Sequence, residues 1–79
     1  MMQIVLPDLG ENVEEATVSF WHIEEGDHVE AGDDVVEIIT EKATFNIQAP
    51  CTGVVTEIMV HEGDIAQVGD ALANIEEEE

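Results

Sequence analysis

The chain has 79 residues, with 20 Asp and Glu against a single Lys or Arg, and its formal net charge is -19. A chain of this length forms one domain and buries only about 60% of the surface that its unfolded form exposes, so we expect neither a deep substrate pocket nor a two-domain catalytic cleft. So acidic a protein is a poor partner for nucleic acid or an anionic membrane, because binding to phosphates depends on Lys and Arg that neutralise them.

Three absences narrow the class of protein further. No stretch approaches the roughly 20 apolar residues of a transmembrane helix, and the N-terminus lacks the basic, then apolar, pattern of a signal peptide. Cys51 is the only cysteine, which excludes an internal disulfide and a disulfide-stapled secreted fold. We therefore expect a soluble protein of the cytoplasm, or of the mitochondrial matrix if the source is eukaryotic.

Short apolar runs separated by turn residues predict the elements in chain order. The runs cover residues 4–6, 18–23, 35–39, 54–60 and 71–75. Segments rich in Gly, Asp and Pro lie between them, at residues 7–10, 25–27, 31–33, 49–53, 62–64 and 69–70. Short runs of this kind at regular spacing are typical of an all-β sandwich or barrel, and no stretch keeps a helical apolar period.

An internal repeat supports two similar halves. Glu25-Gly26-Asp27 and Gly32-Asp33 reappear 37 residues later as Glu62-Gly63-Asp64 and Gly69-Asp70. Gly supplies backbone conformations that a β-carbon forbids, and Asp bonds its own turn. The repeat therefore predicts two sheets related by a pseudo-two-fold axis.

Lys42 is the only lysine, and the chain has no arginine. An offset of 37 from Lys42 reaches residue 79, so its connection is the counterpart of the region where the chain begins and ends, and we expect the two at opposite poles. Residues 40–43 contain no Gly, Asn or Pro to mark a tight hairpin, so the repeat alone predicts the turn. An enzyme that modifies one amine of this chain would find only Lys42 and the N-terminus. Alternatively, Lys42 has no special role and is the one lysine left in a sequence that became acidic by drift. The high negative charge favours encounter with partners that have basic surfaces, or it contributes only to solubility.

Several short motifs lie at fixed distances from Lys42. Gly26 lies 16 residues before it, and Gly53 lies 11 residues after it. The other motifs are Pro7-Asp8-Leu9-Gly10-Glu11, Trp21, Asp27, Gly32-Asp33, Glu41-Lys42-Ala43, Ala49-Pro50 and Gly63-Asp64. Together these residues and spacings resemble the lipoyl domains of 2-oxo acid dehydrogenase complexes, within the biotinyl/lipoyl attachment domains. The opening Pro-Asp-Leu-Gly-Glu is typical of dihydrolipoamide acyltransferase components.

The resemblance implies a fold and a site. The fold is a flattened barrel-sandwich (hammerhead) of two four-stranded antiparallel sheets, with the domain at residues 1–76 and an acidic tail or linker start at 77–79. Lipoic acid would be attached by an amide bond to Lys42 on a β-turn, with Glu41 and Ala43 flanking it. The structural turn glycines would be Gly26, Gly53 and Gly63.

The resemblance also implies a carrier that is not an enzyme by itself and is a monomer when isolated. The arm on Lys42 would swing between a thiamine-dependent 2-oxo acid decarboxylase, an acyltransferase core and a flavin-dependent dihydrolipoamide dehydrogenase, after attachment by a lipoate ligase or transferase. Two departures concern partner recognition: Glu41 replaces the usual Asp, and Ile39 replaces an acidic residue. The alternatives are a biotin carrier domain of a carboxylase, although Lys42 lacks flanking methionines, and an unmodified hammerhead interaction domain.

The remaining candidates favour structural roles. His22, His28 and His61 match no close-set ligand pattern, so we expect no metal site. Cys51 with His61 and Asp64 has the residue types of a catalytic triad, but a triad is defined by geometry, and we expect no catalytic residues. The aromatic residues are expected to pack the core or support a loop (Phe20 and Trp21) and to help fix the hairpin (Phe45).

Overall fold

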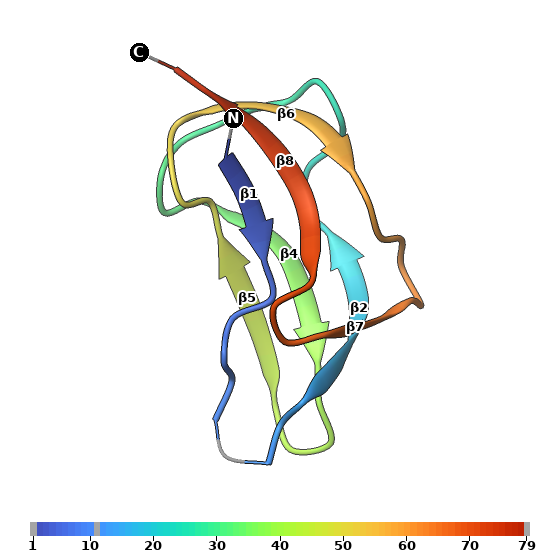
Figure 1. The fold of residues 1–79 in the computed structure, drawn as a ribbon. Coiled ribbons are helices and arrows are strands. Elements are labelled where there is room, and N and C mark those ends of the chain that lie inside the picture. The colour runs from blue at the N-terminus through green and yellow to red at the C-terminus, as the bar shows by residue number, and fades with distance from the viewer. Residues whose placement is uncertain (1, 11, 79) are drawn as a thin grey trace.

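The computed structural model describes residues 2–10 and 12–78. The chain forms two four-stranded antiparallel sheets packed as a flattened sandwich of 37 × 21 × 17 Å, which confirms the expected all-β fold (Figure 1). The sheets have the strand orders β1-β8-β6-β3 and β5-β4-β2-β7. The strands are β1 (Met2–Val5), β2 (Glu15–Trp21), β3 (His28–Val29), β4 (Asp34–Ile39), β5 (Thr44–Gln48), β6 (Gly53–Ile58), β7 (Ile65–Gln67) and β8 (Ala71–Glu77).

The five apolar runs correspond to β1, β2, β4, β6 and β8, whereas three strands have no such run. β3 and β7 have only two and three residues, too few to form a pattern. β5 alternates exposed and covered residues, and Ile47 is its one buried residue. A single buried position is a weak periodic signal. No helix among the described residues is long and apolar enough to cross a membrane.

The core lies between the two sheets and consists of aliphatic side chains. No polar or charged residue is buried among the described residues. Burial of one such aliphatic side chain contributes about 1.5–3 kcal/mol relative to exposure. The largest fully buried residues are Ile4, Leu6, Val18, Val29, Val35, Val36, Ile38, Val55, Leu72 and Ile75.

Phe20 is not part of this core, contrary to one of the roles expected for it. The register between β2 and β4 shifts between Val18 and Phe20, so an extra residue changes the face on which the following side chains lie. Phe20 is 50% exposed and stacks edge-on against His22. Trp21 is half-buried against the core, and its indole Nε1 donates to the carbonyl of Val60 at 3.0 Å.

Four Gly-Asp turns repeat the same hydrogen bonds and carry the pseudo-symmetry. In each turn the Asp amide donates to the carbonyl three residues earlier, and the Asp carboxylate accepts from the amide of that residue at 2.8–3.0 Å. Gly26 and Gly63 have φ of 93° and 94°, which favours glycine. Their amides donate to the carbonyls of Val55 and Val18, which are again 37 residues apart.

Gly53 is the first residue of β6 rather than part of a turn. A β-carbon at this position would overlap the backbone carbonyl oxygen of Glu76 on β8. Glycine is therefore needed there for close approach of two strands.

The termini and the β4–β5 hairpin lie at opposite ends of the long axis, as the repeat predicts (Figure 1). Beyond the last core residue, Ile75, the acidic end of the chain stays in register. Glu76 and Glu77 pair with Val54 and Gly53, and the amide of Glu78 donates to the carbonyl of Thr52. The boundary at 76/77 remains a prediction.

Candidate functional site

The turn that carries Lys42 is closed by the side chain of Thr40. Strand β4 ends at Ile39 and β5 begins at Thr44, and the amide of Thr40 donates to the carbonyl of Ala43 at 2.8 Å. The Thr40 hydroxyl also accepts from the amides of Lys42 and Ala43, at 3.3 and 3.1 Å, and donates to the carbonyl of Ala43 at 3.1 Å. One hydroxyl therefore bonds two amides and one carbonyl of the turn.

This geometry explains a hairpin turn without glycine or asparagine. Among the described residues, Asn12 is the only non-glycine residue with positive φ, so neither Glu41 nor Lys42 needs the backbone conformation that favours glycine. Serine and threonine hydroxyls form such turns by bonding amides two and three residues later. The missed signal was Thr40, two residues before the lysine.

The side chains of the turn face solvent. Glu41, Lys42 and Ala43 are all exposed. Within the described ranges, the single ion pair joins His28 to Glu78, so no described carboxylate is paired with the Lys42 ammonium. The amine is therefore accessible to an enzyme that would acylate it.

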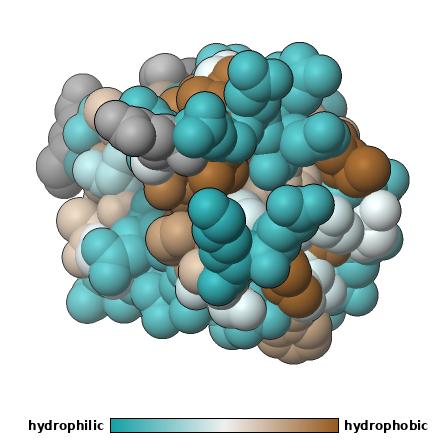
Figure 2. Space-filling view, turned by 90° about the horizontal axis from the view of Figure 1, so that it is seen from below, coloured by the Kyte–Doolittle hydropathy of each residue, from teal (hydrophilic) through white to brown (hydrophobic). Residues whose placement is uncertain are grey.

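A groove of about 570 Å³ lies beside Lys42, and we name it the tip groove. It is open to solvent and crosses the outer face of the β5-β4-β2-β7 sheet. Seen from the hairpin end, hydrophobic patches lie between hydrophilic side chains (Figure 2). The lining residues are Asn12, Val13, Glu14, Glu15, Ala16, Thr17, Ile39, Thr40, Glu41, Lys42 and Ile65.

The tip groove brings together segments that are far apart in sequence. Thr17 on β2 pairs with Ile39 on one side and with Ile65 on the other, so these three β-branched residues form one row across three strands. The sequence pattern did not single out Ile65. Its position beside Lys42 depends on the pairing of the three-residue strand β7, which the apolar pattern does not reveal.

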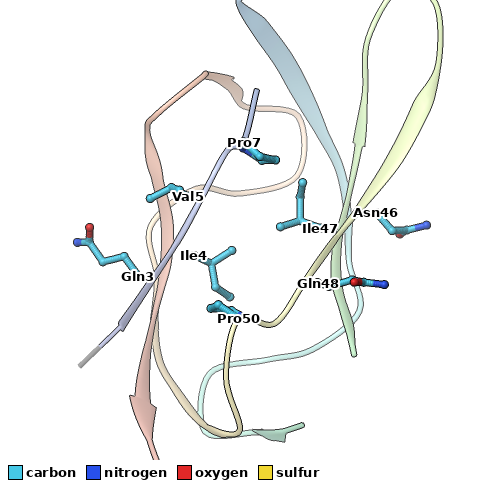
Figure 3. Close-up of a pocket in the computed structure, with 8 residues that line it drawn as sticks. All are labelled: Gln3, Ile4, Val5, Pro7, Asn46, Ile47, Gln48 and Pro50. Atoms are coloured by element: carbon cyan, nitrogen blue, oxygen red, sulfur yellow. The ribbon is translucent and has the colours of Figure 1, made fainter. Parts of the chain in front are cut away.

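A second groove lies on the seam between β1 and β5, the edge strands of the two sheets. Ile4 and Ile47 lie along it, with Pro7 and Pro50 at its margins, whereas the amide side chains of both strands point away (Figure 3). No acid, base or nucleophile lines it. Pro7 and Pro50 lie two residues beyond the ends of β1 and β5, and proline cannot donate a backbone hydrogen bond to a further strand at these positions.

The histidines are engaged separately. His22 Nε2 lies 2.9 Å from Asn46 Oδ1, and His28 Nε2 lies 2.9 Å from Glu78 Oε2. No group of three His, Cys, Asp or Glu residues suited to a metal ion occurs within residues 2–10 and 12–78.

The suspected triad residues have other surroundings. Cys51 is buried, and burial raises the pKa of its thiol, which opposes formation of a nucleophilic thiolate. The Asp64 carboxylate accepts from the backbone amide of His61 at 2.9 Å, within its own turn.

The comparisons with known proteins agree with this fold. The profile of the biotin/lipoyl family, described as "Biotin-requiring enzyme", matches residues 2–75. The chain belongs to the biotin/lipoyl attachment family. A solved lipoyl domain of the 2-oxoglutarate dehydrogenase complex of Azotobacter vinelandii is 31% identical, covers 98% of both chains and superposes with a TM-score of 0.79.

The sequence of the chain is also similar to part of several acyltransferase components. The succinyltransferase component of the 2-oxoglutarate dehydrogenase complex of Rickettsia bellii is 38% identical over 99% of the chain. The lipoamide acyltransferase component of the branched-chain alpha-keto acid dehydrogenase complex of Bacillus subtilis is 38% identical over 96% of the chain. The chain spans only 20% and 18% of these two proteins, about a fifth of their length.

The fold does not discriminate between the two cofactors of the family. The urea carboxylase of Kluyveromyces lactis superposes with a TM-score of 0.80 at 28% identity, over 94% of the chain and 6% of the carboxylase. A lipoyl domain and a carboxylase thus both superpose on this fold, and the fold by itself does not identify an attached group.

Proposed function

We propose that the chain is a lipoyl carrier domain and that Lys42 holds lipoic acid in an amide bond. The observation that supports this most directly is the position of Lys42. The only lysine of the chain lies exposed on a tight turn, at the pole opposite to both termini (Figure 1). A group attached there can reach other proteins without obstruction from the domain.

The residues present fit such an attachment. The Lys42 side chain is exposed, and no described carboxylate pairs with it. Thr40 fixes the backbone from which the amine projects. Amide formation joins an activated lipoyl carboxyl carbon to Nζ, releases the activating group and a proton, and changes the formal net charge from -19 to -20.

The lipoyl group would supply reversible disulfide and acyl chemistry, while the protein supplies presentation and recognition. The role of the chain itself would be to position the amine on the turn and to present the residues around it for recognition. The proposed partners are a lipoate ligase or transferase, a thiamine-dependent 2-oxo acid decarboxylase, an acyltransferase core and a flavin-dependent dihydrolipoamide dehydrogenase. The similarity to acyltransferase components supports this set.

A biotin carrier is the second candidate, favoured by the superposition on a carboxylase. The residues that flank the lysine, Glu41 and Ala43, speak for lipoate, since the related biotinyl domains place methionines there. The two readings differ in which ligase acylates the same amine.

Intact-mass measurement of the full chain tests both candidates. The chain is incubated with a lipoate ligase, lipoate and ATP, and in parallel with a biotin ligase, biotin and ATP. We expect one lipoyl adduct that maps to Lys42, is absent from Lys42→Ala, and has no biotinyl counterpart on streptavidin blotting. A chain that stays unmodified with an active lipoate ligase, or that takes biotin instead, would overturn the lipoyl proposal.

A further inference from the structure

The tip groove contains an apolar strip that the fold does not need. Ile39 is 42% exposed and Ile65 is 64% exposed, and the two lie on either side of Thr17 in one cross-strand row. Neither is among the buried core residues, so neither is needed to hold the two sheets together. Such exposed apolar surface next to a functional residue commonly marks a binding site.

The charges around this strip limit its occupant. Glu14, Glu15 and Glu41 line the same groove, and Lys42 is its only basic residue. Acylation of Lys42 removes that positive charge, so a groove with these three carboxylates repels phosphates and carboxylates. A neutral, apolar ligand is the one that suits both the strip and its rim.

We propose that the occupant is the acyl arm of this same chain: the hydrocarbon chain and dithiolane ring attached to Lys42 lie over Ile39, Thr17 and Ile65. The inference rests on the proposed lipoylation. Because Lys42 itself lines the groove, docking of its arm is intramolecular. It does not carry the entropy cost of bringing in a second molecule. Each methylene of the arm that becomes buried raises the ratio of docked to free arm by about fourfold.

Docking of this kind protects the reactive ring between encounters. The arm would rest on the sheet when no partner is present and be released when a partner covers the tip. Ile39, which departs from the acidic residue common in the resembling domains, is then the residue that turns a charged surface into an arm subsite.

Methyl NMR of the lipoylated full chain provides the test. Isoleucine δ1 methyls are labelled, and through-space contacts to arm protons are recorded for Ile39 and Ile65. A Lys42→Gln chain removes the charge without adding the arm. We expect arm contacts at both methyls, with shifts that Lys42→Gln does not reproduce.

A chemical rate gives the second readout. A soluble phosphine reduces the dithiolane by donating two electrons to the S–S bond, and it takes up oxygen from water to leave two thiols and a phosphine oxide. We expect Ile65→Thr and Ile39→Thr to lower the ratio of docked to free arm by about fourfold or more, with faster reduction. Val5→Thr is the matched control, because Val5 is also 42% exposed but lies on β1 of the other sheet, and it should leave the rate unchanged.

The outcomes separate the two proposals. A lipoylated chain without arm contacts, or with equal reduction rates in all variants, overturns the docking site and leaves the carrier function intact. A chain that a competent ligase does not modify overturns the carrier proposal and the docking site with it. Backbone amide spectra of each variant establish that it is folded.

Discussion

In this hairpin the Thr40 side chain closes the turn, a role that glycine or asparagine has in most two-residue β-turns. Its hydroxyl accepts from two amides and donates to one carbonyl, so the turn closes without positive φ at Glu41 or Lys42. A single side chain therefore fixes the backbone on which Lys42 lies. The same residue is the reason that turn propensity alone misjudged the segment.

Replacement of Thr40 by valine tests this role. Valine keeps the β-branched shape and removes the hydroxyl, so we expect a loss of about 1 kcal/mol in the free energy of unfolding, the usual net value of such a hydrogen bond. We also expect slower acylation of Lys42, because the turn is less well fixed. Urea unfolding and ligase kinetics measure the two effects. Thr44→Val, also exposed and two residues past Lys42, is the control, and equal effects of both variants would contradict the assignment.

Among the elements, the sequence predicts the long strands well and the short ones poorly. The repeat of Gly26 at Gly63 anticipates both the pseudo-symmetry and the opposite poles, since glycine and aspartate determine those turns through local bonds. The outward position of Phe20 and the row from Ile39 to Ile65 were not predictable, because a strand bulge and the pairing of β7 are non-local. Lys42 was identified by type and spacing, whereas the groove beside it depends on tertiary structure.

β8 is held at its end by an ion pair across the sheet. His28 on β3 contacts Glu78, just past β8, and the hydrogen bond and charge of Glu78 raise the pKa of His28 above its ordinary value of 6.5, with help from Glu30 and Asp33. A raised folded-state pKa means that this contribution to stability is fully present below the unfolded pKa. It is lost as the pH rises through the folded pKa.

We therefore expect Glu78→Gln to lower the pKa of His28, as followed by its ring-proton shifts in an NMR titration. The variant should also reduce the difference in stability between acidic and neutral pH that His28 contributes. Glu76→Gln removes a similar charge from β8 without a bond to His28 and serves as the control. An unchanged His28 titration in Glu78→Gln would show that the contact is absent in solution.

On the scale of the whole molecule, a high negative charge is concentrated on a small body. A formal charge of -19 is spread over a body only 37 Å long, so every carboxylate lies within range of many others at low salt. The same field would steer the tip toward basic partner surfaces and away from other acidic domains. Self-repulsion is the cost of that selectivity, and the aliphatic core must offset it.

Salt should therefore stabilise the domain. The screening length falls from about 30 Å at 0.01 M ionic strength, comparable with the long axis of the molecule, to about 3 Å at 1 M. We expect the free energy of unfolding, measured with urea at several NaCl concentrations, to rise steadily over this range. A Glu24→Gln/Glu76→Gln chain has two fewer negative charges and should show a higher stability at low salt and a smaller salt dependence. A stability that falls with salt would mean that favourable ion pairs, rather than repulsion, dominate the folded state.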